Sequence, residues 1–391
     1  MQSEIAAHAN SILQQVKRRM FGMDDVVRLC LVALYTDGHV LLEGNPGLGK
    51  TELVKTLGDT LGVGFGRIQF TPDLMPADIT GTYMPDLEDS AVREWRFRPG
   101  PIFASLLLAD EINRATPKTQ SAMLEAMAER QVTVLGSKHS LPRPFMVLAT
   151  QNPIDQEGTY NLPEAQADRF MFKIAMPVPS GETLLAIMHK QAGRVYSIDG
   201  DRAKTSGGET EVKRQNAVDS AAALKRQHEF RSKIEEVTPL PSLQDHIRNM
   251  FLASNQRFAE LMDIKDQAQR REVERLSRLI TYGLGPRAAI ALMLGVKAWS
   301  VLFPPEPEGV EGASQAPALA RVVVPVLRHR VKLNFNWQER YTGKPEPEDG
   351  YPPGLLEQFL KEFCLITAPS AAPSQRLYRD ALRRDLSEIA V

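Results

Sequence analysis

The stretch HVLLEGNPGLGKTELVKTL, which begins at His39, constrains the fold more than any other part of the chain. An apolar run ends before Gly44, three glycines and a proline fall within six residues from there, and a helical pattern begins near Lys50. The spacing fits G-x-x-x-x-G-K-[ST], in which backbone N–H groups wrap around phosphate oxygens at the start of a helix. The alternative is an ordinary strand-to-helix turn, which does not require this spacing followed by Lys and Thr. The sequence therefore predicts a phosphate-binding loop between a strand and a helix.

This loop predicts how a nucleotide would be held. Lys50 is expected to reach the β- and γ-phosphates of ATP, and the Thr51 hydroxyl is expected to bind Mg²⁺. Glycines let the backbone approach the phosphates closely, because they carry no side chain. The residues expected to bind the nucleotide are Gly44, Asn45, Pro46, Gly47, Leu48, Gly49, Lys50, Thr51 and Glu52.

A second apolar run, SLLLADEINRA, leads into two acids, Asp110 and Glu111. A carboxylate at the end of a buried strand is costly unless it has a partner, and bound Mg²⁺ is such a partner. We expect Asp110 to hold the metal through water and Glu111 to polarise the water that attacks the γ-phosphate. Such a pair taken alone often marks only the start of a helix. Together with a phosphate-binding loop it predicts ATP hydrolysis.

Three more polar residues are candidates for the same site. Asn152 ends the run FMVLATQN, where an α/β sheet delivers side chains beside a bound nucleotide, although it could instead turn the chain before Pro153. Arg169 and Arg287 could neutralise the charge that develops during phosphoryl transfer, a role often filled by a neighbouring subunit. For either arginine the alternative is a surface salt bridge.

Five short apolar runs alternate with helical patterns in the first part of the chain, namely HVLLEG, FGRIQF, SLLLADE, PFMVLATQN and MFKIAMP. This alternation predicts an α/β fold with a parallel sheet whose strands are covered on both faces. Two further stretches, one from Thr71 and one from Arg130, have the pattern of hairpins. We expect residues 1–194 to form this α/β core with an N-terminal helix, residues 195–238 a charged linker or mobile insert, and residues 239–391 an all-helical domain.

Composition argues against several classes of protein. The net charge is −1 and no basic domain with interleaved aromatic residues is visible, so nucleic acid is not an expected partner. Two distant cysteines without a CxxC or HExxH motif argue against a disulfide framework and against zinc. The first residues lack the pattern of a signal peptide, and the apolar stretch from Ala288 is interrupted by Lys297. We therefore expect a cytoplasmic protein without a membrane span.

Taken together, these motifs resemble the MoxR family of AAA+ ATPases. The resemblance runs from about Phe21 to Phe172, through FGMDDVV, LLEGNPGLGKT, FTPDLMPADITG, PGPIFASLLLADEINRA, ATQNP and EGTYNLPEAQADRF in the family's order. Beyond the charged segment, YGLGPRA and VLRHRV resemble the helical lid of the family. The charged segment itself is longer than the family leads us to expect.

The resemblance implies a role for each candidate residue. These roles are Walker A for Gly44–Thr51, Walker B for Asp110 and Glu111, sensor 1 for Asn152, arginine finger for Arg169 and sensor 2 for Arg287. It also implies a P-loop AAA+ core with five strands in the order 5-1-4-3-2, hairpin inserts that line a central pore, and a helical lid. The implied assembly is a homo-oligomeric ring, a hexamer, that uses ATP and Mg²⁺. Such motors remodel other proteins in a chaperone-like manner, often with a partner that has a von Willebrand factor A (VWA) domain.

Two other functions remain open at this point. A magnesium-chelatase-like motor subunit would carry the same core motifs. An MCM-like nucleic-acid translocase would carry them too, but the nearly neutral net charge argues against it. In related rings the lid can be displaced toward a neighbour, so Arg287 could act on its own subunit or on the next one.

Overall fold

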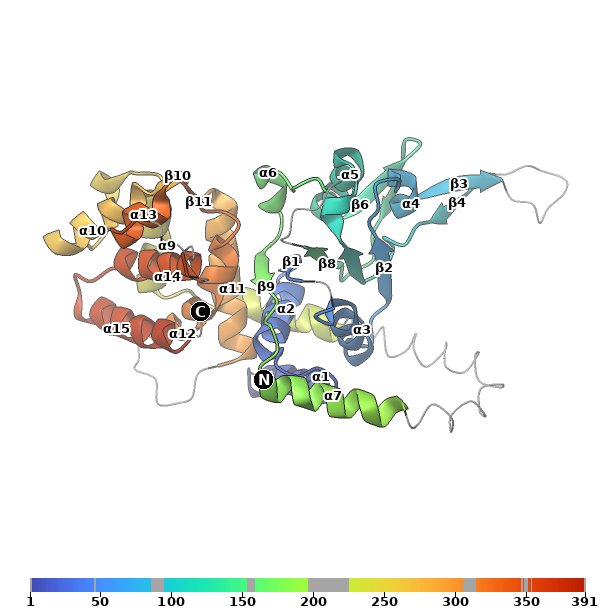
Figure 1. Ribbon diagram of the computed structural model, residues 1–391, viewed down its shortest axis with the longest axis horizontal. Helices are drawn as coiled ribbons and strands as arrows, with labels where there is room; N and C mark the ends of the chain where they lie inside the picture. Colours follow the sequence, from blue (N-terminus) through green and yellow to red (C-terminus); the bar gives the residue numbers. More distant parts are fainter. Residues whose placement is uncertain are drawn as a thin grey trace. The chain divides into compact units, whose positions relative to one another are not determined.

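A computed structural model describes residues 2–45, 47–85, 95–152, 159–195, 225–304, 314–345, 347, 351–352 and 354–389 (Figure 1). The chain divides into two compact units. The core unit consists of Ala7–Leu162 and Ile174–Arg231, and the lid unit consists of Met1–Ala6, Pro163–Lys173 and Ser232–Val391. The lid unit therefore includes a short segment, Pro163–Lys173, from within the sequence of the predicted α/β core.

A five-stranded sheet forms the centre of the core, as the apolar runs predict. Its strands lie in the order β2 (Phe65–Gln69), β5 (Leu106–Asp110), β8 (Met146–Gln151), β1 (Val40–Glu43) and β9 (Phe172–Ala175). The pairs β2–β5, β5–β8 and β8–β1 are parallel. Numbered along the chain among themselves, the strands have the order 5-1-4-3-2, which confirms the predicted fold class. Because the strands are parallel, the carboxyl ends of β1, β5 and β8 meet at one edge of the sheet.

Burial of the strands follows their position in the sheet. β1, β5 and β8 are buried along nearly their whole length. The expectation that every strand is covered on both faces is wrong for β2, in which only Ile68 is fully buried. β2 lies at the edge of the sheet, where polar side chains can stay in contact with water. Arg67 and Gln69, two positions apart, share one exposed side of this strand.

The helices between residues 2 and 195 are α1 (Gln2–Lys17), α2 (Asp24–Tyr35), α3 (Lys50–Leu61), α4 (Pro76–Thr80), α5 (Pro117–Glu129), α6 (Glu164–Ala167) and α7 (Gly181–Val195), with a 3₁₀ turn at Ile112–Arg114. α3 packs against β5. Cys30 lies in α2 as a buried free thiol, and burial raises its pKa to about 12. Residues 225–236, within the segment predicted as a linker or mobile insert, are helical, and residues 196–224 lie outside the described residues.

Both predicted hairpins are present in the core unit. They are formed by β3 (Gly81–Pro85) with β4 (Trp95–Pro99) and by β6 (Gln131–Val134) with β7 (Ser137–Ser140). The hairpins contact each other, because the ring of His139 stacks on Phe97 with centroids 3.8 Å apart. Residues 86–94, between β3 and β4, lie outside the described residues.

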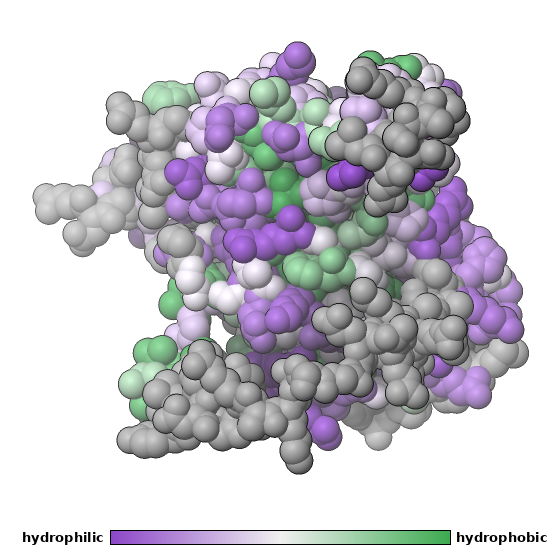
Figure 2. All heavy atoms as spheres, turned by 90° about the vertical axis from the view of Figure 1, so that its right-hand side faces the viewer, coloured by the Kyte–Doolittle hydropathy of each residue, from purple (hydrophilic) through white to green (hydrophobic). Residues whose placement is uncertain are grey.

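On the side of the molecule shown in Figure 2, hydrophilic areas alternate with smaller hydrophobic ones.

The lid unit is helical, as predicted, and also contains a short antiparallel ladder. Besides α6, its helices are α9 (Pro241–Ser254), α10 (Gln267–Ser277), α11 (Pro286–Leu302), α12 (Ala316–Leu327), α13 (Trp337–Thr342), α14 (Leu355–Thr367) and α15 (Pro373–Glu388), with a 3₁₀ turn at Phe258–Glu260. The ladder joins β10 (Ile280–Tyr282) to β11 (Lys332–Leu333). The apolar stretch from Ala288 forms α11, which packs against α12. Among the described residues, no helix is long and apolar enough to cross a membrane.

His39 and His246 are buried and His329 is half-buried, and the pKa of each of the three imidazoles is lowered. His39 Nδ1 accepts a hydrogen bond from the backbone N–H of Val147 at 3.0 Å, which requires that nitrogen to carry no proton. Burial lowers the pKa of His39 to about 3 and the pKa of His246 to about 4. Burial also holds the pKa of His329 well below its usual value. Folding therefore keeps these three imidazoles neutral, although in the unfolded chain they would titrate near neutral pH.

We expect these histidines to make the protein less stable in mild acid. Below about pH 6.5 the unfolded chain binds protons that the folded chain excludes, so the free energy of unfolding falls as the pH drops. Each buried histidine should cost about 2 kcal/mol between about pH 7 and about pH 5. Urea unfolding at both pH values measures the loss. His39→Gln should reduce the loss by that amount, whereas exposed His228→Gln should not. Equal losses in all three proteins would contradict this account.

Candidate functional site

The predicted phosphate-binding loop connects β1 to α3 in the core unit. Gly47 and Gly49 have φ angles of 85° and 77°, a left-handed conformation that residues with a side chain rarely adopt. α3 begins at Lys50, so the unpaired N–H groups of its first turn lie next to the loop. Pro46 lies outside the described residues. The other predicted nucleotide-binding residues occupy this loop and the first turn of α3.

Close packing explains the first glycine of the loop. A Cβ atom at Gly44 would lie 2.8 Å from the Cβ of Met176 and 3.2 Å from the Cδ1 of Leu48. A side chain at this position would therefore push the loop away from the end of β1. The backbone N–H of Gly44 donates to the carbonyl oxygen of Gln151 at 3.3 Å, which ties the loop to the end of β8.

Lys50 folds back over the loop. Its ammonium donates to the carbonyl oxygen of Gly44 and lies 3.5 Å from the carbonyl oxygen of Gln151. Burial lowers the pKa of Lys50, and the nearby carboxylates of Asp110 and Glu111 oppose this shift. A half-buried ammonium beside converging N–H groups provides what the phosphates of a nucleotide require.

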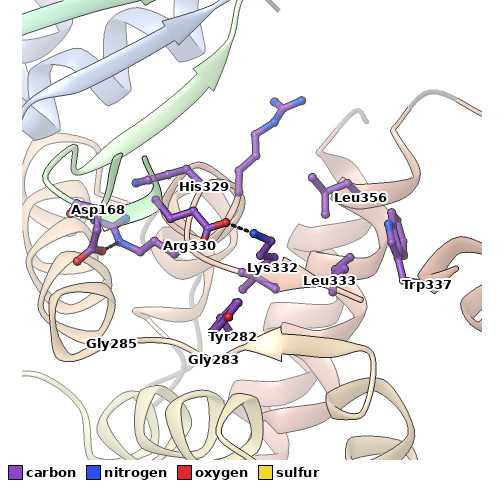
Figure 3. A pocket seen from close by; sticks show the side chains of 13 residues that line it. Asp168, Tyr282, Gly283, Gly285, His329, Arg330, Lys332, Leu333, Trp337 and Leu356 are labelled. Carbon is purple, nitrogen blue, oxygen red and sulfur yellow. Dashed lines mark hydrogen bonds and ion pairs between the residues drawn. The ribbon is translucent and has the colours of Figure 1, made fainter. Parts of the chain in front are cut away.

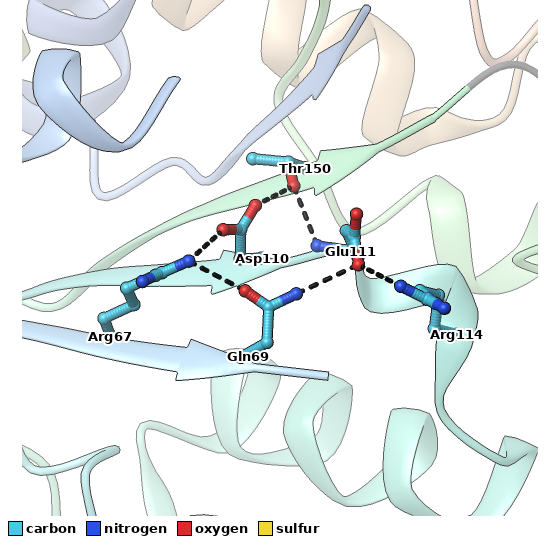
Figure 4. Close-up of polar contacts among 6 residues, drawn as sticks. All are labelled: Arg67, Gln69, Asp110, Glu111, Arg114 and Thr150. Atoms are coloured by element: carbon cyan, nitrogen blue, oxygen red, sulfur yellow. Dashed lines mark hydrogen bonds and ion pairs between the residues drawn. The ribbon is translucent and has the colours of Figure 1, made fainter. Parts of the chain in front are cut away.

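Asp110, at the end of β5, is fixed through both of its carboxylate oxygens (Figure 4). Oδ1 accepts a hydrogen bond from the Thr150 hydroxyl at 2.7 Å, and Oδ2 pairs with Arg67 at 2.8 Å. The side chain is only 15% exposed. A carboxylate held in one orientation next to a phosphate-binding loop fits the expected role of holding Mg²⁺ through water.

Glu111 has an unusual backbone conformation for a glutamate, with φ 56° and ψ 49°. Its N–H donates to the Thr150 hydroxyl at 2.8 Å. Its Oε2 accepts from Gln69 at 3.0 Å and from Arg114 at 2.9 Å (Figure 4). The side chain is 31% exposed, so water can reach it. Left-handed backbone at a non-glycine residue is often found at functional sites, where the surroundings enforce it.

Asn152 directly follows Gln151, whose carbonyl oxygen contacts the loop, and is half-buried. The carboxyl ends of β1, β5 and β8 thus bring Lys50, Asp110, Glu111 and Asn152 to one edge of the sheet. In the part of the chain that the structure describes, no cluster of three His, Cys, Asp or Glu could hold a metal by itself. The oxygen donors Thr51 and Asp110 suit Mg²⁺, which keeps several waters and takes phosphate oxygens as further ligands.

Comparison with known proteins agrees with this geometry. Residues 39–172 match the model of the ATPase family associated with various cellular activities (AAA). The chain is 51% identical to the chaperone MoxR1 of Mycobacterium tuberculosis over 176 residues, which cover 45% of this chain and 46% of that protein. In this region the chain is similar to the MoxR family of AAA+ ATPases. It is also 51% identical to the uncharacterized protein YeaC of Bacillus subtilis over 179 residues, which cover 46% of this chain and 55% of that protein.

The chain spans about half the length of these two curated relatives. A crystal structure of a protein assigned as an ATPase, from Cytophaga hutchinsonii, is similar with a TM-score of 0.68 and 29% sequence identity. That likeness covers 92% of this chain and 96% of the other. It therefore extends beyond the matched core into the helical region.

The two arginines that the MoxR resemblance singles out both belong to the lid unit. Arg169 follows α6 and is half-buried. Arg287 lies in the first turn of α11, where its Nη1 is 3.8 Å from Oδ2 of Asp168 and its side chain is 57% exposed. The structure thus brings Arg287 close to the residue that precedes Arg169 in the chain. Their roles as sensor 2 and arginine finger remain predictions.

Four residues that hold the acids in place were not predicted from the sequence, namely Arg67, Gln69, Arg114 and Thr150. Arg67 and Gln69 carry a signal that could have found them, because two polar residues alternate within the run FGRIQF and so share one side of a strand. Thr150 lies two residues before Asn152, and alternation along a strand would place two such positions on one side. Its hydroxyl donates to the carboxylate of Asp110 and accepts from the backbone N–H of Glu111.

Removing the Thr150 hydroxyl should slow hydrolysis without unfolding the core. In Thr150→Val the carboxylate of Asp110 and the N–H of Glu111 lose their shared partner, and valine keeps the shape of threonine. We expect kcat for ATP to fall about 10-fold, which corresponds to about 1.4 kcal/mol. Phosphate release at saturating ATP measures this, with thermal melting as the check on folding. Thr150→Ser restores the hydroxyl and should recover most of the rate. Equal rates for the Val and Ser variants would contradict this role.

Proposed function

We propose that the chain hydrolyses ATP with Mg²⁺ as cofactor, and that hydrolysis drives the remodelling of partner proteins. The observation that carries this proposal is the meeting of Lys50 with two positioned acids at the carboxyl ends of neighbouring strands. A phosphate-binding loop alone would support binding. The addition of Glu111, a carboxylate that water can reach, supports hydrolysis.

In the proposed reaction the N–H groups of the loop and the ammonium of Lys50 bind the phosphates. Thr51 and Asp110 would hold Mg²⁺. When bound, this cation would offset the negative charge of the phosphates. Glu111 polarises the attacking water, and Asn152 orients that water or the γ-phosphate. Each of these residues lies in the core unit.

The charge that develops during the reaction requires a further cation. We propose Arg169 as the arginine finger, acting on the nucleotide of a neighbouring subunit, and Arg287 as sensor 2. Catalysis then requires a closed homo-oligomeric ring with head-to-tail interfaces, a hexamer in this proposal. A relative with 51% identity is named a chaperone, which supports a remodelling role. We further propose a partner with a VWA domain and a cytoplasmic location.

Release of inorganic phosphate from ATP by the full chain tests the proposal. We expect release that requires Mg²⁺ and that Lys50→Ala abolishes, because this variant lacks the cation that binds the phosphates. Single-stranded DNA should leave the rate unchanged, which separates the chain from a nucleic-acid translocase. Release no faster than in Lys50→Ala, with the parent protein folded and assembled, would overturn the proposal.

A further inference from the structure

The segment that carries Arg169 is held to the lid unit by residues that follow α12. Pro163–Lys173 follows β8 in the sequence and ends within β9, yet it belongs to the lid unit. Lys332 pairs with Glu164 near the start of this segment. The Nε2 atom of His329 lies 3.0 Å from the carbonyl oxygen of Phe170 and donates to it.

Arg330 makes the most extensive of these contacts. Its side chain is only 4% exposed and points into the segment (Figure 3). Nε donates to Oδ1 of Asp168 at 2.8 Å, and Nη2 donates to the carbonyl oxygens of Asp168 and Phe170 at 3.2 and 2.7 Å. Nη1 donates to the carbonyl oxygens of Met171 and Val326 at 3.1 and 2.7 Å. All five N–H groups of the guanidinium are therefore occupied.

These contacts involve the residues immediately before and after Arg169 in the chain. The carbonyl oxygens before and after it, those of Asp168 and Phe170, are both bound by Arg330. The backbone N–H of Arg169 donates to the carbonyl oxygen of Gln166 at 3.2 Å. Arg330 therefore restrains the backbone on both sides of Arg169.

Asp168 also connects this arrangement to Arg287. Its Oδ1 accepts from Arg330, while its Oδ2 lies 3.8 Å from Nη1 of Arg287. The carboxylate of Asp168 thus contacts both Arg330 and Arg287, the predicted sensor 2. Asp168 and Arg330 also help to line a pocket of about 470 Å³, together with Tyr282 and Trp337 (Figure 3).

We propose that Arg330 is a positioning residue that fixes residues 168–171 to the lid unit and so presents Arg169 to the nucleotide of the neighbouring subunit. Because its five donors are used within its own subunit, Arg330 does not itself bind the nucleotide. This inference rests on the proposed ATP hydrolysis across subunits. It adds that the finger moves with the lid unit, so that any displacement of the lid unit also displaces Arg169.

Arg330→Lys tests this role, because a lysine keeps the charge but cannot reproduce the five-donor fork. We expect kcat to fall about 10- to 100-fold while KM for ATP stays within about threefold, as for loss of a group that acts only during the reaction. Arg328→Lys is the matched control. Arg328 pairs with Glu357 and makes no described contact with residues 168–171, so its replacement should leave kcat within about twofold of the parent.

Two further measurements separate positioning from general damage. Arg330→Lys combined with Arg169→Ala should be no slower than Arg169→Ala alone, because a finger that is absent cannot be misplaced. Arg330→Lys subunits should also regain activity when they co-assemble with Lys50→Ala subunits, which supply a correctly placed Arg169. If Arg330→Lys does not fold, Asp168→Asn takes its place in the same measurements. It keeps an acceptor oxygen but loses the ion pair, and we expect a loss of about 5- to 10-fold in kcat.

A folded Arg330→Lys protein with the kcat of the parent would overturn the inference. Additive losses in the double variant, or no recovery in mixed assemblies that demonstrably form, would also overturn it. If Asp168→Asn is used instead, a folded protein with the kcat of the parent would likewise overturn the inference. None of these results would contradict the proposal that the chain hydrolyses ATP. That proposal is contradicted only if the parent protein itself does not release phosphate.

Discussion

Glu111→Gln should bind ATP about as tightly as the parent and hydrolyse it at least ~100-fold more slowly, the usual scale for losing a catalytic base or charge stabiliser. Glutamine keeps the length of the side chain and one oxygen that can accept from Gln69 or Arg114, so the local structure should persist. It cannot polarise the attacking water as a carboxylate does. Phosphate release and the binding of a fluorescent ATP analogue measure the two effects separately.

Lys50→Ala and Glu125→Gln complete this comparison. Lys50→Ala should lose nucleotide affinity, because it lacks the cation that contacts the phosphates. Glu125 is an exposed acid of α5 outside the site, so Glu125→Gln should bind and hydrolyse ATP like the parent. If Glu111→Gln also hydrolyses ATP at the parent rate, Glu111 is not the residue that polarises the water.

Arg169→Ala should bind ATP and assemble, yet hydrolyse it at least ~100-fold more slowly, since an arginine finger contributes about 1,000-fold or more in related phosphoryl transfers. A lysine at the same position should restore little of this rate, because a single ammonium cannot bridge two oxygens as a guanidinium does. The rate at saturating ATP, together with sedimentation to follow assembly, measures this effect. A parent-like rate in an assembled Arg169→Ala protein would exclude the finger role.

The fold could be predicted from the sequence because its local signals agree with one another. The run before Gly44 is apolar, the glycines permit the left-handed loop, and the residues from Lys50 onward favour a helix. The five apolar runs became the five strands of the sheet, and the two stretches with a hairpin pattern became hairpins. These are short-range patterns, and each of them is visible within about 20 residues.

The contacts that fix the site could not be predicted in the same way. Thr150, Arg67 and Gln69 meet the acids only because β8 and β2 flank β5 in the sheet, and single-sequence patterns do not give those pairings. The division into units was missed for the same reason. From its place in the sequence, Pro163–Lys173 was predicted to belong to the core. In the structure it belongs to the lid unit, where Asp168 binds Arg330, more than 150 residues away in the chain.

Mixing Arg169→Ala with Lys50→Ala tests most directly whether each site is built from two copies of the chain. Each variant alone should be nearly inactive. In a mixed ring, an intact Lys50 from one variant can face an intact Arg169 from the other, so up to about a quarter of the interfaces of an equal mixture become complete. The account predicts that the mixture recovers a corresponding part of the parent activity and loses it on dilution below the assembly concentration. No recovery at any mixing ratio, in rings shown to contain both variants, would contradict it.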